Sequence, residues 1–185
     1  EEIQIAKTAV DNAQISLKTA QQNLEDINAQ AKENLRQAYE DSINILDDSY
    51  LKIENSFTVV DSIQKTYFIT NDQESIAVRE NRDKIKGFLN ETKPYLDAAK
   101  TDPKDEKVDA ALSKMKEGLE ATSDALKIIR ENCETLNYRN RVSLTDKNSI
   151  DTQRGYIIEA LTNITNSQQE ISSIKLTNEY NLSLI

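Results

Sequence analysis

Apolar residues recur along the first part of the chain at alternating steps of three and four. From Ile3 to Ala31 this spacing is the a/d seam of a coiled coil. Steps of four follow as far as Ile43, a stutter that locally unwinds a supercoil, and the earlier rhythm then resumes. Because no Gly or Pro interrupts the pattern, it predicts one helix over residues 1–69, roughly 100 Å long at about 1.5 Å per residue.

Capping residues and prolines indicate two further helices. Asp72 is the expected N-cap of the second helix, and Pro94 should disturb the last turns of that helix. Asp102 is expected to cap the third helix, with Pro103 at its first position, where a missing N–H costs nothing. The heptad of this third helix runs without a break to Leu136, through a Cys133 that we expect to be buried.

A fourth helix is expected after a turn region from Asn140 to Asn148. Its apolar seam continues to Ile185 but becomes polar through Asn178 and Asn181. A buried Asn in such a seam fixes the register of the two helices at a cost in stability.

The helix lengths indicate whether the two ends of the chain meet. Lengths are counted upward for the first and third helices and downward for the second and fourth. The addition places Ile185 beside about residue 37, so residues 1–35 would have no partner within the chain. Two explanations stay open. Either the chain is a piece of a longer protein whose next stretch pairs with these residues, or the first helix breaks near 47–49 or 55–56 and folds back. We favour the first, because no strong helix breaker stands at either place.

These patterns predict an all-α protein, an elongated antiparallel coiled-coil hairpin with a distal up-down four-helix bundle. The expected domains are a proximal coiled-coil arm (1–38), a distal bundle that forms an enlarged hairpin tip (39–158) and a returning coiled-coil helix (159–185). The residues expected to form the coiled-coil interface are Ile3, Ala6, Val10, Ala13, Leu17, Ala20, Leu24, Ile27, Ile164, Ile171 and Ile174.

Composition narrows the chemistry that the chain can perform. With 3 Gly and 2 Pro in 185 residues, turn-rich β folds are disfavoured. Without His and with one Cys, ordinary Cys/His zinc sites and Ser–His or Cys–His catalysis are excluded. Adjacent carboxylates such as Glu25 and Asp26 point about 100° apart on a helix, so they make poor catalytic pairs. We therefore expect no enzyme, no cofactor and no metal.

The charge and the apolar runs restrict the partners. A net charge of −9 argues against a nucleic-acid surface, and we interpret the acidic first 70 residues as a solvated helix face. No run of about 18 apolar residues is present, so no transmembrane segment is expected in this chain.

Two stretches resemble the α-helical hairpin of membrane-fusion proteins, the periplasmic adaptor or HlyD-like family. They are EEIQIAKTAVDNAQISLKTAQQNLEDINAQA at residues 1–31 and EALTNITNSQQEISSIKLTNEYNL at residues 159–182. The resemblance covers about a third of the chain. It implies an extracytoplasmic (periplasmic) arm of an efflux or secretion system, anchored to the inner membrane through parts outside this chain. It also implies self-association and contact with a transporter and an outer conduit.

The tip of the hairpin departs from the family. An ordinary adaptor hairpin turns once, whereas residues 40–145 form what reads as a helical bundle. Many adaptors carry Arg, Leu and Ser at the tip for docking, and the turn Arg139–Leu144 contains these residue types in a different arrangement. The candidate tip contacts are Tyr67, Phe68, Arg139, Arg141, Ser143 and Leu144.

Two other functions stay open. A four-helix extracytoplasmic sensor domain, as in chemoreceptor-like proteins, would bind a small molecule between its helices and transmit small helix shifts. A cytosolic coiled-coil scaffold is the third alternative. The segments that flank the chain in its gene distinguish the three: lipoyl-like strands for an adaptor, transmembrane helices for a sensor, and neither for a scaffold.

Overall fold

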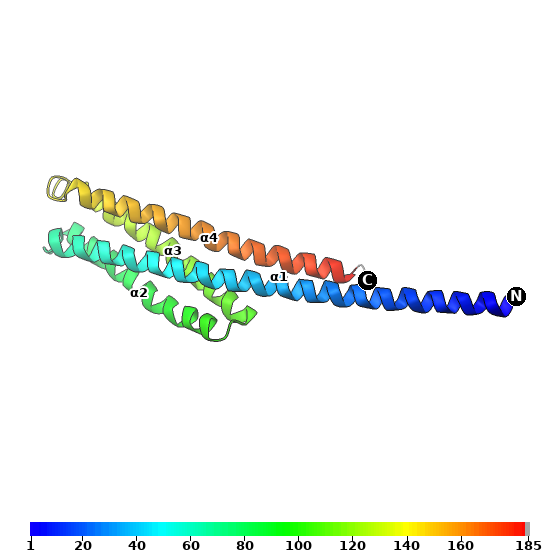
Figure 1. The fold of residues 1–185 in the computed structure, drawn as a ribbon. Helices are drawn as coiled ribbons and strands as arrows, with labels where there is room; N and C mark the ends of the chain where they lie inside the picture. Colours follow the sequence, from blue (N-terminus) through cyan, green and yellow to red (C-terminus); the bar gives the residue numbers. More distant parts are fainter. Residues whose placement is uncertain (184–185) are drawn as a thin grey trace. The chain divides into compact units, whose positions relative to one another are not determined.

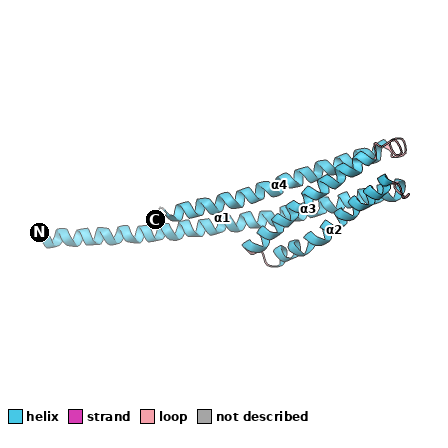
Figure 2. Ribbon diagram, turned by 180° about the vertical axis from the view of Figure 1, so that it is seen from behind, coloured by secondary structure: helices cyan, strands magenta, loops and turns pink. Residues whose placement is uncertain are grey.

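The computed structural model describes residues 1–183, which form four helices and no strand (Figures 1 and 2). The connections between them are residues 68–72, 102–104 and 133–143. The predicted all-α class is confirmed. The helices are α1 (Glu2–Tyr67), α2 (Gln73–Thr101), α3 (Asp105–Asn132) and α4 (Leu144–Ser183).

The chain divides into two compact units. One unit, which we call the arm, contains Glu1–Ala38 of α1 and the α4 residues from Glu170 onward. The other unit, the bundle, is Tyr39–Gln169. The sequence-based boundary at 38/39 falls at the same place, whereas the second boundary lies after Gln169 rather than after residue 158.

Contacts between side chains establish how α1 and α4 run in the bundle. Ser42 Oγ lies 2.6 Å from Ser167 Oγ, and Ser56 Oγ lies 3.4 Å from Gln153 Oε1. Because residue numbers rise on α1 as they fall on α4, the two helices are antiparallel.

Ion pairs show the same up-down order for other neighbouring helices. They join α1 to α2, and they join α3 and the turn residue Glu134 that follows it to α4. Rising numbers on one side are again matched by falling numbers on the other. The pairs are Asp47–Lys100 and Asp61–Arg82 for the first two helices, and Arg130–Asp151 and Glu134–Lys147 for the second two. The bundle is therefore built by up-down connections, as expected from its short turns.

The core of the bundle is made of apolar residues at heptad spacing on each helix, which places them on one face. Fully or almost fully buried are Leu46, Ile53 and Val60 on α1, Val78 and Ile85 on α2, Leu112, Leu119 and Leu126 on α3, and Ile150, Ile157 and Ile164 on α4. Burying a side chain of this size stabilises the fold by about 1.5–3 kcal/mol.

Small polar residues share this interior. Ser42, Ser49 and Ser56 repeat at heptad spacing on α1, and all three are buried. Ser42 hydrogen-bonds across to Ser167 of α4, and Ser56 donates to the Lys52 carbonyl of its own helix over 2.8 Å. The Ser49 hydroxyl is buried without a hydrogen-bond partner among residues 1–183. The seam between α1 and α4 therefore mixes apolar layers with small hydroxyl layers.

The helix ends confirm one capping prediction and correct another. Asp72 is the N-cap of α2, and its carboxylate accepts the backbone N–H of Ser75 over 2.7 Å. Asp102, by contrast, is the C-cap of α2, and α3 begins only at Asp105. The prediction that Asp102 and Pro103 start the third helix is wrong, because the backbone N–H of Asp102 bonds to the Ala98 carbonyl at the end of α2 and Lys104 is the N-cap of α3. Pro94 lies inside α2, which continues beyond it.

The third helix ends earlier than its heptad predicts. α3 stops at Asn132, and the following residues form turns until α4 begins at Leu144. Leu136, the last residue of the expected heptad, is 80% exposed, whereas Cys133 is buried as expected. Because α3 is shorter than expected, the sum of helix lengths changes. The expected pairing of Ile185 with residue 37 concerns a residue that lies outside the described part of the chain.

The arm shows the actual register of α1 and α4 there. The side-chain amide of Asn178 donates to the carbonyl oxygen of Ala31 over 3.1 Å. Leu24, Ile27 and Leu35 are half-buried, so part of the stretch 1–35 does have a partner within the chain. Residues 1–23 are exposed throughout. The alternative break near 47–56 is also wrong, because α1 is helical there.

Candidate functional site

The exposed part of the arm carries the first six of the predicted coiled-coil interface residues. Ile3 is 86% exposed and Leu17 is 60% exposed, and Val10 and the seam alanines are exposed as well. The seam alternates a large residue with Ala: Ile3, Ala6, Val10, Ala13, Leu17, Ala20. Single exposed apolar residues are ordinary on a protein surface, but a periodic stripe of this kind is typical of an interface.

The remaining predicted interface residues are at least partly buried. Ile164 is buried in the bundle and Ile171 in the arm, while Ile174, Leu24 and Ile27 are half-buried in the arm.

The predicted polar stretch of the fourth-helix seam forms a shallow groove in the arm. The groove has a volume of about 130 Å³ and is lined by Ile27, Gln30, Ala31, Asn34, Thr177, Asn178 and Asn181. Asn178 is half-buried and bonds to a backbone carbonyl of α1. A polar side chain bonded in this way favours one register over its neighbours, the role that we predicted for Asn178.

A hydrogen-bond network closes one end of the bundle. The hydroxyls of Thr70 and Tyr138 each donate to Asp72 Oδ2 over 2.6 Å. Because the Tyr138 proton points to Asp72, the Ser75 hydroxyl, 2.8 Å from Tyr138 Oη, donates to that oxygen. The network ties the connection between α3 and α4 to the connection between α1 and α2.

The network favours ionised carboxylates. Hydrogen bonds from Thr70 and Tyr138 hold the pKa of Asp72 far below its ordinary value. Hydrogen bonds from Ser143 and Tyr67 likewise lower the pKa of Asp146. Both carboxylates therefore remain charged near neutral pH while they hold the ends of helices in place.

The candidate tip contacts divide into buried and exposed residues. Phe68 is fully buried and stacks on Tyr138 with ring centroids 4.3 Å apart, so the prediction that Phe68 contacts a partner is wrong. Tyr67 donates its hydroxyl proton to Asp146 over 2.7 Å. The other candidates, Arg139, Arg141, Ser143 and Leu144, are exposed.

Sequence reasoning missed the structural roles of two residues at this end. Ser143 caps α4, because its Oγ accepts the backbone N–H of Asp146 and donates back to the Asp146 carboxylate. The signal was present as Ser143-Leu144-Thr145-Asp146, a capping-box pattern with Asp in the last place. Tyr138 is the second, and no local pattern indicates its bond to Asp72, which lies 66 residues away.

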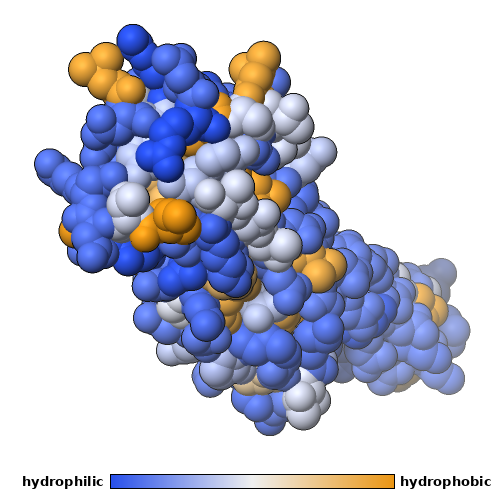
Figure 3. Space-filling model, turned by 90° about the vertical axis from the view of Figure 1, so that its left-hand side faces the viewer, coloured by the Kyte–Doolittle hydropathy of each residue, from blue (hydrophilic) through white to orange (hydrophobic). Residues whose placement is uncertain are grey.

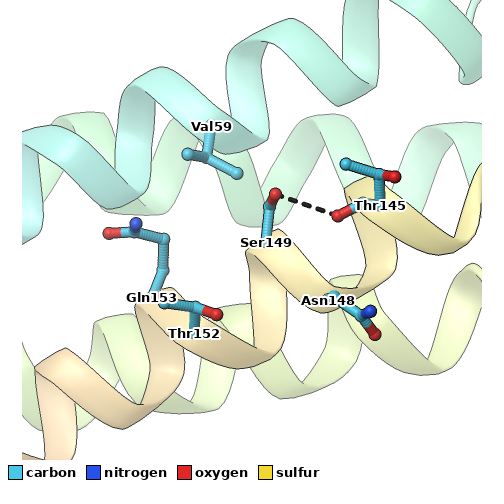
Figure 4. Close-up of a pocket in the computed structure, with 6 residues that line it drawn as sticks. All are labelled: Val59, Thr145, Asn148, Ser149, Thr152 and Gln153. Carbon is cyan, nitrogen blue, oxygen red and sulfur yellow. Dashed lines mark hydrogen bonds between the residues drawn. The ribbon is translucent and has the colours of Figure 1, made fainter.

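A second polar groove lies between α1 and α4 of the bundle (Figure 4). Its volume is about 330 Å³, and it is lined by Val59, Thr145, Asn148, Ser149, Thr152 and Gln153. Val59 comes from α1 and the rest come from α4, where Ser149 Oγ donates to the Thr145 carbonyl over 2.9 Å. The lining offers hydroxyls and amides and no charge, which suits a neutral polar ligand.

Three further properties of residues 1–183 concern metal binding, the single thiol and the membrane. Within residues 1–183, no group of three Cys, Asp or Glu side chains is placed to hold a metal ion. Burial raises the pKa of the Cys133 thiol to about 11, so this thiol is a poor nucleophile at neutral pH. None of the helices in this range carries an apolar stretch that could cross a membrane.

Comparison with known proteins adds no family to this picture. No family model matches the chain, and no curated protein or solved structure matches it significantly. The features that bear on function are therefore the all-α fold, the exposed seam of the arm and the hydrogen-bonded end of the bundle.

Proposed function

We propose that this chain is the non-enzymatic helical arm of a membrane-fusion, or periplasmic adaptor, protein. In this role it lies outside the cytoplasm and helps to bridge an inner-membrane transporter and an outer conduit. The observation that carries the proposal is the exposed heptad seam of α1 from Ile3 to Ala20. A regular seam that lacks a partner within the described residues is suited to packing against another helix of the assembled protein.

The proposed mechanism is mechanical. Neither Gly nor Pro occurs in α1, so this helix has no local sequence cause for a kink. The bundle adds a closed core and a hydrogen-bonded end. A helical element of this kind can keep two partners at a fixed separation without binding a substrate itself.

The proposal is tested by placing charges on the seam of the complete membrane-anchored protein. In the variant Val10→Glu/Leu17→Glu, two seam positions become charged and packing against a second helix becomes unfavourable. The matched control is Ile5→Glu/Ile15→Glu, because Ile5 and Ile15 are similarly exposed but lie off the seam. Both variants add the same charge to the same helix.

We expect the seam variant to lose oligomer formation, measured by cross-linking in cells, and to lose export by the system. The control should keep both. Full assembly and export in the seam variant would overturn the proposal, as would an equal loss in the control. Circular dichroism of the purified chains checks that both variants remain helical.

A sensor domain is the second candidate, and the polar groove of the bundle favours it. A neutral ligand in the groove between Val59 and Gln153 would contact α1 and α4 together. Ligand contacts with both helices could bias a small shift between them. A thermal-shift screen of neutral sugars and amides tests this function, with Thr152→Leu as the variant that should abolish any shift. Absence of a shift with every compound would leave the sensor without support.

A further inference from the structure

One end of the bundle presents a surface formed by the two helix connections, residues 68–72 and 133–143, and the start of α4. The connections are held together by the bonds of Tyr138 to Asp72 and Ser75 and by its stacking on Phe68. The side-chain amine of Lys147 also donates to the Arg139 carbonyl over 2.8 Å. Because these contacts already order the backbone, a ligand that binds this end surface does not have to order it.

Three large aliphatic side chains stand out from the end surface. Ile69 is 67% exposed, Leu136 is 80% exposed and Leu144 is 71% exposed. Figure 3 faces this end and shows hydrophobic side chains that protrude separately from a mainly hydrophilic surface. They do not merge into one continuous patch in that view.

Two arginines of the end surface have no carboxylate partner. Arg139 and Arg141 are exposed, and neither guanidinium forms an ion pair with any residue of 1–183; Arg141 instead lies over the Tyr138 ring, 5.0 Å from its centroid. The carboxylates of the two connections are already engaged. Asp72 accepts hydrogen bonds within the network, and Glu134 pairs with Arg130 and Lys147. The two arginines are therefore not neutralised by a carboxylate among residues 1–183, whereas both carboxylates of the connections are hydrogen-bonded or ion-paired, although the Glu134 side chain is half exposed.

We propose that the end surface binds the headgroup layer of an anionic lipid bilayer. Ile69, Leu136 and Leu144 enter the boundary between headgroups and acyl chains, and Arg139 and Arg141 contact lipid phosphates. Such a division of apolar and cationic side chains is the general basis of interfacial membrane binding. The inference goes beyond the proposed arm function and does not depend on it.

The arrangement of the side chains favours a bilayer over a protein partner. A protein surface would need a separate hollow for each protruding side chain, since protein interfaces bury contiguous, complementary surfaces. A fluid bilayer accommodates separate side chains without matched hollows. The net charge of −9 does not prevent this contact, because charges more than about 10 Å away are largely screened at roughly 0.1 M salt.

Vesicle flotation of the whole chain tests the proposal. The probes are vesicles of phosphatidylcholine alone and of phosphatidylcholine with one third phosphatidylglycerol. We expect binding to the anionic vesicles, weaker binding to the neutral ones, and a decrease with added salt. The variant Leu136→Ser/Leu144→Ser should bind the anionic vesicles at least about tenfold more weakly than the unaltered chain. The variant Arg139→Gln/Arg141→Gln should lose the preference for anionic lipid.

Matched controls separate the end surface from other exposed apolar residues. Leu51→Ser/Ile158→Ser changes two exposed aliphatics elsewhere on the bundle, and Val10→Ser/Leu17→Ser changes the arm seam. Both controls should bind as the unaltered chain does. Absence of vesicle binding would overturn the proposal, and so would binding that only the arm control reduces. Thermal unfolding of each variant verifies that the fold is retained.

A reporter at the end surface gives a second readout. In Leu136→Cys the new thiol is exposed, whereas Cys133 is buried with its pKa raised to about 11 by burial, so a polarity-sensitive fluorophore will label position 136 selectively. We expect its emission to shift to the blue with anionic vesicles. The same label in Leu51→Cys should not shift, and an equal shift at both positions would contradict binding through this end.

Discussion

The arm and the bundle carry the same kind of heptad pattern, yet they bury it to very different degrees. Leu17 in the arm is exposed, whereas Leu119 in the bundle is completely buried. Both are leucines at seam positions of long helices. The difference shows that a heptad specifies a face that can be buried, while the number of neighbouring helices decides whether it is buried.

The largest expected effect compares these two leucines. Leu119→Ala removes a fully buried side chain and should lower the free energy of unfolding by about 2–5 kcal/mol. Leu17→Ala should change it by no more than about 0.5 kcal/mol, because the side chain is already in water. Urea unfolding of the purified chain measures both. A large loss for Leu17→Ala would break the comparison, since it would mean that the arm seam is buried in solution.

Glycines sharpen the contrast between packed and open helix surfaces. A Cβ at Gly118 would lie 3.2 Å from Thr92 Cγ2, and Thr92 is held by a hydrogen bond to the Phe88 carbonyl. At Gly87 the same Cβ would meet nothing within 4 Å. We expect Gly118→Ala to destabilise by about 1 kcal/mol through overpacking, and Gly87→Ala to stabilise by about 0.5–1 kcal/mol through helix propensity.

Urea midpoints at constant m-value provide the measurement for the two glycine variants. Gly155→Ala is a further control, because a Cβ there also meets nothing within 4 Å. A gain in stability for Gly118→Ala would show that Thr92 gives way easily.

The closed end of the bundle should make stability depend on pH. The pKa of Asp72 is lowered in the folded chain by the hydroxyls of Thr70 and Tyr138. The stabilisation is therefore complete above the unfolded-state pKa of about 3.9 and is lost as the pH falls through the folded-state pKa. Asp72→Asn should be less stable than the unaltered chain at pH 7, and the difference should shrink toward pH 3.

Urea unfolding at several pH values tests the Asp72 prediction. Asp105→Asn serves as the matched control, because Asp105 is an exposed carboxylate in the first turn of α3. A stability difference for Asp72→Asn that stays constant with pH would contradict the assigned role of the ionised carboxylate.

The smallest effects concern the serines of the bundle seam. Ser49→Ala removes a buried hydroxyl that has no partner among residues 1–183, so it should stabilise by about 0.5–1 kcal/mol. Ser42→Ala leaves the buried hydroxyl of Ser167 without its 2.6 Å contact and should destabilise by about 1 kcal/mol. Thermal unfolding under identical conditions compares the two. A gain in stability for both variants would indicate that helix propensity outweighs hydrogen bonding in this seam.

Much of the fold follows from local patterns in the sequence. The absence of Gly and Pro over residues 1–69 predicted the long α1, which ends at Tyr67. Asp72 was identified as an N-cap because a cap acts on backbone groups only a few residues away. The apolar face of each helix was readable for the same reason, since it depends only on spacing along the helix.

Tertiary contacts decided what these local patterns left open. The heptad runs on to Leu136, yet α3 ends at Asn132, where the chain turns so that Tyr138 can stack on Phe68 and bond to Asp72. Because α3 ends earlier than its heptad, the register of the helices differs from the expected one and Leu136 is exposed. Spacing along the chain thus determined which residues share a helix face. Contacts between residues far apart in sequence decided where α3 stops and which faces are covered, because burial requires a neighbour that no local pattern specifies.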